Sequence, residues 1–118
     1  MSEETTVVLR EMVGSEYCVA SSDGERVYGT IRAALGGGQN VVLSFRNVAL
    51  LTSAFLNAAI GRLYGDFTEE ELRDRVREVD MSLEDEALLQ RVIATAKAYF
   101  KNPDRFKQLH IGGEDADE

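Results

Sequence analysis

The segment from Val41 to Gly65 reads VVLSFRNVALLTSAFLNAAIGRLYG and decides the fold. It opens with an apolar run, Val41–Phe45, which is typical of a buried central strand. After a second apolar step at Val48–Leu51, the hydroxylated turn Thr52-Ser53-Ala54 leads into an apolar helix. A helix that follows a strand in this way places free N–H groups and a partial positive charge at the turn. The segment therefore predicts an α/β domain whose candidate site is this turn.

Two further apolar runs lie near the amino terminus. Thr6–Met12 and Tyr17–Ala20 both have the composition of strands, and a short polar turn around Gly14 separates them. Two strands joined by a short turn commonly pair with each other, so we expect a hairpin here.

A first helix is expected between this hairpin and the central segment. Ser22 and Glu25, three residues apart, have the pattern of a capping box that begins a helix. Apolar residues follow at helical spacing, and the pattern stops at the glycine run Gly36–Gly38. A phosphate loop would need the opposite order, with the strand before the glycines and the helix after them, so we interpret the run as a helix end.

The carboxyl-terminal half predicts two more helices and one strand. Thr68 and Glu71 form a second capping box before a short acidic helix. The alternating run Val76–Met81 predicts a short strand, and a long helix follows from Ser82 to the residues before Pro103. This order of elements is typical of a small α/β domain with a mixed sheet of about four strands.

Length and charge limit the possible functions. A chain of 118 residues suits a single domain with one core, and we expect a folded body over residues 6–110 and an acidic tail over residues 111–118. The net charge of -8 argues against nucleic acid or an anionic membrane as the partner, because both require a basic face. No apolar run approaches the ~20 residues that a membrane span needs.

Few side chains suit catalysis or metal binding. Cys18 is the one cysteine, and its apolar neighbours favour a buried hydrophobic role and a reduced, cytoplasmic setting. His110 is the one histidine and lies close to the carboxyl-terminal end. A loop of the calcium-binding type is missing from the sequence. We therefore expect a protein that is not an enzyme and uses no catalytic residue, metal or cofactor.

Three motifs within Val41–Pro103 resemble a known family. They read VVLSF, TSAFLNAAIGRLYG and MSLEDEALLQRVIATAKAYFKNP. Together they resemble the STAS-like domain family of the DUF4325 type, small bacterial and phage-associated domains that look like sulphate-transporter and anti-sigma-factor-antagonist (STAS) domains. The resemblance implies the same order of elements, with helices mainly on one face of the sheet. It also implies a non-enzymatic, regulatory role exerted through protein–protein interaction.

The resemblance also implies a phosphoacceptor. In STAS antagonists, a serine just before a helix is phosphorylated by a partner kinase, and Ser53 falls at that place. Thr52 stands where those domains usually have Asp, and Phe55 stands where they have Gly. The candidate partner or ligand contacts are Thr52, Ser53, Ala54 and Asn57. The partner that the resemblance implies is an ATPase-type, anti-sigma-like kinase.

Three other interpretations remain open. Thr52 or Ser53 could act only as the N-cap of the helix. The helix amino terminus after Ser53 could hold a small anion or a nucleotide. The excess of carboxylates could mimic nucleic acid and inhibit a host protein, which would require them to gather on one ordered face. The sequence fixes neither the partner nor the oligomeric state.

Overall fold

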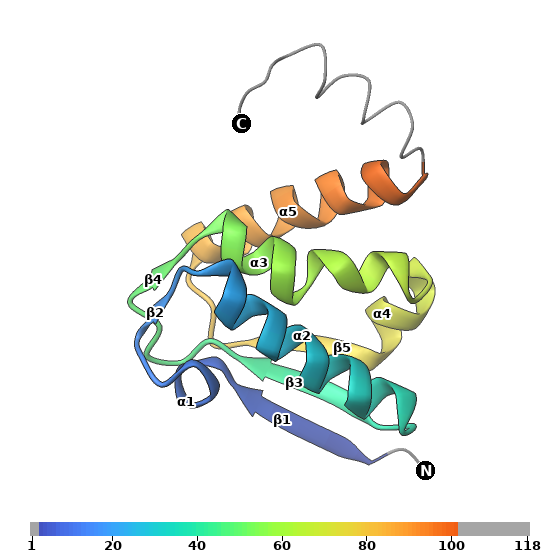
Figure 1. Cartoon of the computed structure of the whole chain (residues 1–118), viewed down its shortest axis with the longest axis horizontal. Coiled ribbons are helices and arrows are strands. Elements are labelled where there is room, and N and C mark those ends of the chain that lie inside the picture. The colour runs from blue at the N-terminus through green and yellow to red at the C-terminus, as the bar shows by residue number, and fades with distance from the viewer. Residues whose placement is uncertain (1–2, 102–118) are drawn as a thin grey trace.

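The computed structural model describes residues 3–101 (Figure 1). In chain order, its elements are β1 (Glu4–Val8), α1 (Leu9–Val13), β2 (Tyr17–Cys18), α2 (Ser21–Gly36), β3 (Asn40–Ser44), β4 (Leu50–Leu51), α3 (Ser53–Ala59), the 3₁₀ helix η1 (Gly61–Gly65), α4 (Glu69–Arg75), β5 (Val76–Val79) and α5 (Leu83–Lys101). The predicted acidic tail, His110 and Pro103 lie outside the described residues.

The main sheet has three parallel strands in the order β1-β3-β5. The central position predicted for Val41–Phe45 is confirmed, because β3 pairs with β1 on one side and with β5 on the other. The short strand predicted at Val76–Met81 is also present, as β5. Parallel neighbours require a crossover connection, and each connection here contains helices.

The predicted hairpin and the mixed four-stranded sheet are wrong. β2 does not pair with β1; it pairs in parallel with β4 as a separate two-stranded sheet. The run after β1 forms the helical turn α1 because Leu9, Met12 and Val13 have the i, i+3, i+4 spacing of one helix face. Gly14 ends α1 in the left-handed region, with φ 83°.

Helices α2, α3 and α5 lie on the same side of the main sheet (Figure 1), as the resemblance implies. Helices α2 and α3 approach each other closely at Gly24, which is buried. A Cβ at this position would lie 2.5 Å from the Phe55 carbonyl oxygen and 2.8 Å from the Ala58 Cβ. Only glycine allows this helix pair to pack at this separation.

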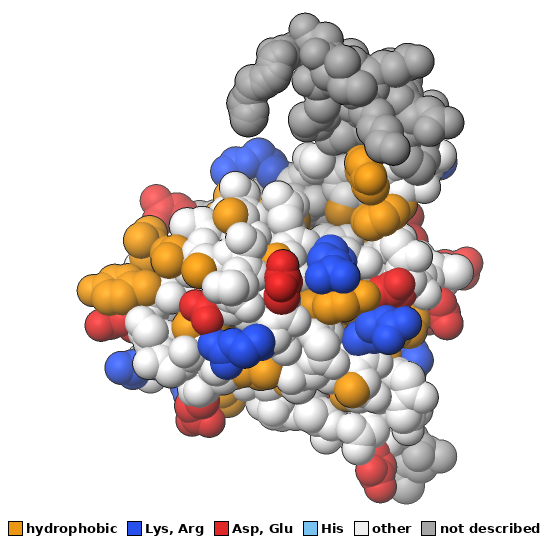
Figure 2. Space-filling view, viewed as in Figure 1, with side chains coloured by type: hydrophobic (Ala, Val, Ile, Leu, Met, Phe, Trp, Pro, Cys, Tyr) orange, Lys and Arg blue, Asp and Glu red, His pale blue; other side chains and the backbone are white. Residues whose placement is uncertain are grey.

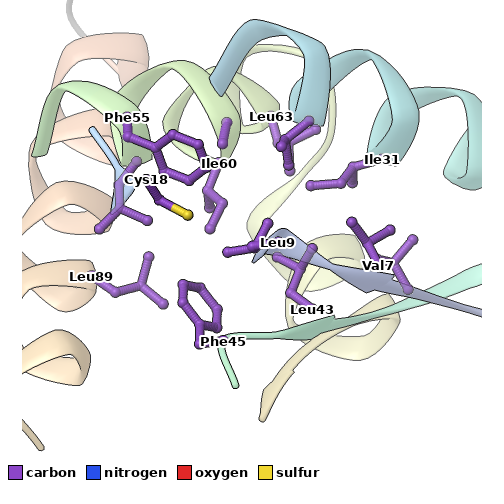
Figure 3. Packing of buried hydrophobic residues seen from close by; sticks show 14 of the residues in the cluster. Val7, Leu9, Cys18, Ile31, Leu43, Phe45, Phe55, Ile60, Leu63 and Leu89 are labelled. Atoms are coloured by element: carbon purple, nitrogen blue, oxygen red, sulfur yellow. The ribbon is translucent and has the colours of Figure 1, made fainter. Parts of the chain in front are cut away.

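The core lies between the main sheet and this helix layer (Figure 3). Phe55 from α3 is fully buried and points toward the same apolar interior as Cys18 and Leu89. The strands contribute alternate residues that point to the helix side, Val7, Val41 and Leu43, and Phe45 directly after β3 joins them.

The opposite face of β3 is also buried. Val42 and Ser44 point away from the core cluster, yet they are only 6% and 4% exposed. Glu4 of β1 and Arg77 of β5 form an ion pair of 3.6 Å, and β3 lies between these two strands. Side chains of the flanking strands therefore cover the central strand on this side.

Of the two capping boxes that the sequence predicts at helix starts, the structure contains one. The capping box of Thr68 and Glu71 is present, with both reciprocal hydrogen bonds. The capping box predicted from Ser22 is wrong, because α2 begins two residues earlier than a Ser22 N-cap would place it, and its N-cap, Ala20, makes no side-chain bond. Asp23 in the first turn pairs instead with Arg26 at 2.7 Å.

Candidate functional site

The candidate site lies at the end of β4, where the chain enters α3. Thr52 is the N-cap of α3, and its side-chain oxygen accepts a hydrogen bond from the Phe55 N–H at 3.2 Å. The same hydroxyl donates to the Val19 carbonyl at 2.7 Å. Because Val19 directly follows β2, this side chain ties together the ends of β2 and β4. Thr52 therefore has a structural role, as the N-cap interpretation expects.

The next residues of the turn face outward. Ser53, Ala54 and Asn57 are exposed, whereas Phe55 and Leu56 between them are fully buried. Within residues 3–101, the side chains of Ser53 and Asn57 form no hydrogen bond. The structure thus places a free hydroxyl on a turn that buried neighbours hold in position.

Two apolar residues that the sequence analysis did not select lie beside this turn. Tyr17 and Leu50 are register partners in the β2–β4 pair, and each is 53% exposed. Their successors, Cys18 and Leu51, point inward and are buried. Figure 2 shows hydrophobic side chains gathered at the edge of the molecule where Figure 1 places β2 and β4. A half-exposed apolar cross-strand pair is therefore part of the same surface region.

The start of α2 is a third neighbour of the turn. Strands β2 and β4 run in parallel and are each followed by a helix, so α2 and α3 begin side by side. Ser21 and Ser22 at the start of α2 are exposed, as Ser53 is at the start of α3. The sequence contained a signal for this arrangement, since both strands are short apolar runs followed by hydroxylated helix starts.

Helix α3 offers little to a free anion. It has only seven residues, so few peptide dipoles add up along its axis. The Phe55 N–H is already bonded to the Thr52 side chain, and the Leu56 N–H to the Thr52 carbonyl. This geometry favours a docking turn over an anion pocket at this helix.

The charges on the described surface are interspersed. Within residues 3–101, five ion pairs connect acidic and basic side chains, and Figure 2 shows red and blue groups alternating across the visible face. A nucleic-acid mimic would need carboxylates concentrated on one face, and the face in this view has no such concentration.

The titratable side chains of the interior do not form a catalytic set. Cys18 is fully buried, and this burial, together with Asp23, raises the pKa of its thiol to about 11. The thiol is therefore neutral and unreactive near neutral pH. Among the described residues, there is no group of three His, Cys, Asp or Glu side chains that could hold a metal ion.

Glu78 is the one core-side carboxyl of the main sheet. It is the register partner of Leu43 and lines a cavity of about 310 Å³ with Tyr64 and Gln90. Burial raises the pKa of Glu78, and a backbone hydrogen bond opposes the rise. Burial also raises the pKa of Tyr64. These two groups lie away from the turn, and the sequence analysis selected neither.

Comparison with known proteins confirms the family that the sequence resembles. The family model described as the STAS-like domain of unknown function (DUF4325) matches residues 23–86, which is more than half of the chain and includes the turn. The chain belongs to this family. No curated protein and no solved structure is similar enough to count as a match. Within residues 3–101, every helix is too short or too polar to span a membrane.

Proposed function

We propose that this protein is a non-enzymatic regulatory domain that binds a protein partner through one face. This docking face consists of Tyr17, Leu50, Ser53, Ala54 and Asn57. One observation carries the proposal. The exposed Ser53 hydroxyl, which forms no hydrogen bond within residues 3–101, lies beside the half-exposed pair of Tyr17 and Leu50, and buried neighbouring residues hold both in position.

The composition of the docking face suits protein recognition. Aromatic side chains are enriched among the residues that dominate binding energy, and Tyr17 is the exposed aromatic of this face. Small residues such as Ser53 and Ala54 let a partner's backbone approach closely. The apolar pair spans β2 and β4, and Thr52 connects the ends of these two strands, so the face is pre-organised and little order has to form on binding.

We further propose that phosphorylation of Ser53 controls this docking. A phosphate adds a charge of about -1.5 to -2 near pH 7. At Ser53 it would lie near the start of α2, a helix of 16 residues whose dipole stabilises negative charge. The same charge would lie next to an apolar contact pair and would oppose a partner that buries it. An ATPase-type kinase of the anti-sigma kind fits both roles, as docking partner and as phosphate donor.

The experiment combines this protein with ATP and purified ATPase-type kinases of the anti-sigma kind. Intact-mass spectrometry measures phosphate on the full chain, and calorimetry measures binding. We expect one added phosphate on the natural chain and none on Ser53→Ala. Ser53→Asp should weaken binding, whereas Thr95→Asp, which places the same charge at an exposed hydroxyl position of α5, should not.

The two parts of the proposal fail separately. Phosphate on Ser53→Ala at the natural level would rule out Ser53 as the phosphoacceptor. Unchanged binding in both Tyr17→Ser and Leu50→Ser would rule out the docking face, whatever happens at Ser53. A small-molecule function at this turn would instead appear as a rise in melting temperature with a nucleotide and no kinase present.

A further inference from the structure

A separate cavity opens at the carboxyl ends of β1 and β3. Its volume is about 400 Å³, and its lining is Val8, Arg10, Glu11, Gly14, Ser15, Arg46 and Asn47. These residues come from the start of α1, the turn before β2 and the turn after β3. In Figure 1, α1 lies beside the end of β1, next to the turn that follows β3. Open parallel sheets generally bind their ligands outside the carboxyl ends of the strands, as this cavity would.

Two arginines line this cavity in a chain with a net charge of -8. Arg10 forms no ion pair or side-chain hydrogen bond within the described part of the chain. Arg46 has a loose, exposed ion pair with Glu11 at 3.5 Å. An exposed pair of this length contributes little, so the guanidinium is available to a stronger acceptor. Two arginines and one glutamate are therefore among the residues that line the cavity.

The turns that hold these side chains are fixed by the backbone. Asn47 has a positive φ of 61°, a left-handed conformation that Asn adopts more readily than most other non-glycine residues and that suits a tight turn. The buried Ser44 hydroxyl donates to Asp80 at 2.9 Å and accepts from the Arg46 N–H at 3.4 Å. The Ala49 N–H donates to the Glu16 carbonyl at 2.8 Å, which joins the two turns that border the cavity.

The remaining polar groups are suited to an acceptor ligand. The Ser15 oxygen accepts from the Tyr17 N–H at 3.0 Å, so its own hydrogen is free to donate. The Asn47 side chain adds an amide donor. A Cβ at Gly14 would meet nothing within 4 Å, so the space beside this residue is open.

We propose that this cavity binds a small phosphate-bearing anion. Arg10 and Arg46 would supply the charge and the paired N–H donors that guanidinium groups offer to phosphate oxygens, and Ser15 and Asn47 would complete the donor set. The cavity is larger than one phosphate group needs, which suits a pyrophosphate or a small phosphorylated molecule. Glu11 would compete with the ligand for Arg46.

Calorimetry on the full chain at low ionic strength tests the proposal, with inorganic phosphate, pyrophosphate and adenosine monophosphate as probes. We expect Arg10→Gln and Arg46→Gln each to weaken binding about tenfold, and the double variant to abolish it. Arg91→Gln removes an exposed arginine of α5 outside the cavity and is the matched control, which should bind as the natural chain does. Tighter binding of adenosine monophosphate than of phosphate would identify a phosphorylated molecule as the ligand; the reverse would identify an inorganic anion.

Glu11→Gln gives a test in the opposite direction. Removal of the competing carboxylate frees Arg46, so we expect binding several-fold tighter, which a merely structural role of Arg46 would not produce. Amide NMR shifts on the natural chain provide a readout that needs no variant, and they should move at Gly14, Ser15 and Asn47. The proposal is overturned by no binding at about 10 mM probe, by equal binding in the arginine double variant, or by shifts at Ser53 and Ala54 instead.

Discussion

The two parallel sheets of this molecule use the same strand geometry in opposite ways. The three-stranded sheet buries both faces of its central strand, where Val42 and Leu43 are successive residues and both are covered. The two-stranded sheet buries Cys18 and leaves its neighbour Tyr17 half exposed. The larger sheet can stabilise the fold because its side chains find partners on both sides. The smaller one presents an apolar surface that residues 3–101 leave half exposed.

The same contrast recurs between adjacent residues of the turn. Thr52 uses its hydroxyl for two internal hydrogen bonds, and Ser53 uses its hydroxyl for none within the described chain. One residue maintains the structure, and the next keeps an exposed hydroxyl that we propose a partner reads. The following predictions test this division between stabilising and presenting residues, beginning with the largest expected effect.

Truncation of a buried side chain beneath the turn should have the largest effect on the free energy of unfolding. Phe55→Ala removes a fully buried aromatic ring and should lower the free energy of unfolding by about 3–5 kcal/mol. Leu50→Ala, at a half-exposed position, should change it by about 0.5 kcal/mol or less. Denaturant unfolding measures both. Similar losses in the two variants would show that the β2–β4 pair contributes to stability as the core does.

Substitution at the contact between α2 and α3 should have the next largest effect on stability. Gly24→Ala places a methyl group against the Phe55 carbonyl and should cost about 1–3 kcal/mol. Gly29→Ala in the same helix meets nothing within 4 Å and should stabilise the protein by about 0.5–1 kcal/mol. Thermal melts of the two variants should therefore shift in opposite directions, and a shared direction would contradict the close approach at Gly24.

Substitutions at Thr52 and Ser53 should differ in their effect on stability. Thr52→Ala loses an N-cap and a bond to Val19, and should lower the free energy of unfolding by about 1–2 kcal/mol. Ser53→Ala should leave it within about 0.5 kcal/mol. Equal losses in denaturant unfolding would mean that Ser53 is also a structural residue.

The smallest expected effect on stability comes from substitution of Glu78, and it should depend on pH. Burial raises the folded-state pKa of Glu78 above its ordinary value of 4.5, so the folded state disfavours its charged form. This penalty is absent at low pH and appears as the pH rises from about 4.5 through the folded-state pKa. Glu78→Gln should therefore be more stable than the natural chain at pH 7, and the difference should vanish below pH 4.5. A stability difference that does not change with pH would contradict the assignment.

Local patterns explain what the sequence could predict. The uniform apolar run of β3 and the capping box at Thr68 depend on near neighbours in the chain, and both are confirmed. The hairpin failed because strand pairing depends on distant partners: β1 pairs with β3, and β2 with β4. The spacing of Leu9 and Met12 is also compatible with a helix, but the apolar composition of this run favoured a strand.

The candidate site was predictable only in part. The junction of strand and helix selected Ser53, Ala54 and Asn57, which are exposed, and it also selected Thr52, whose hydroxyl the structure uses internally. Tyr17 could not be found in this way, because it joins the turn only through the parallel pairing of β2 with β4. The arginine-lined cavity likewise depends on two turns that are distant in the sequence and joined by one backbone bond.

The affinity of the docking face for an ATPase-type kinase of the anti-sigma kind is the most direct test of the account. Calorimetry would compare the natural chain with Tyr17→Ser, and denaturant unfolding would be measured on both. We predict binding at least about tenfold weaker in the variant, with the free energy of unfolding unchanged within about 0.5 kcal/mol. Full affinity in Tyr17→Ser would show that the exposed pair and its neighbouring turn are not where this protein meets its partner.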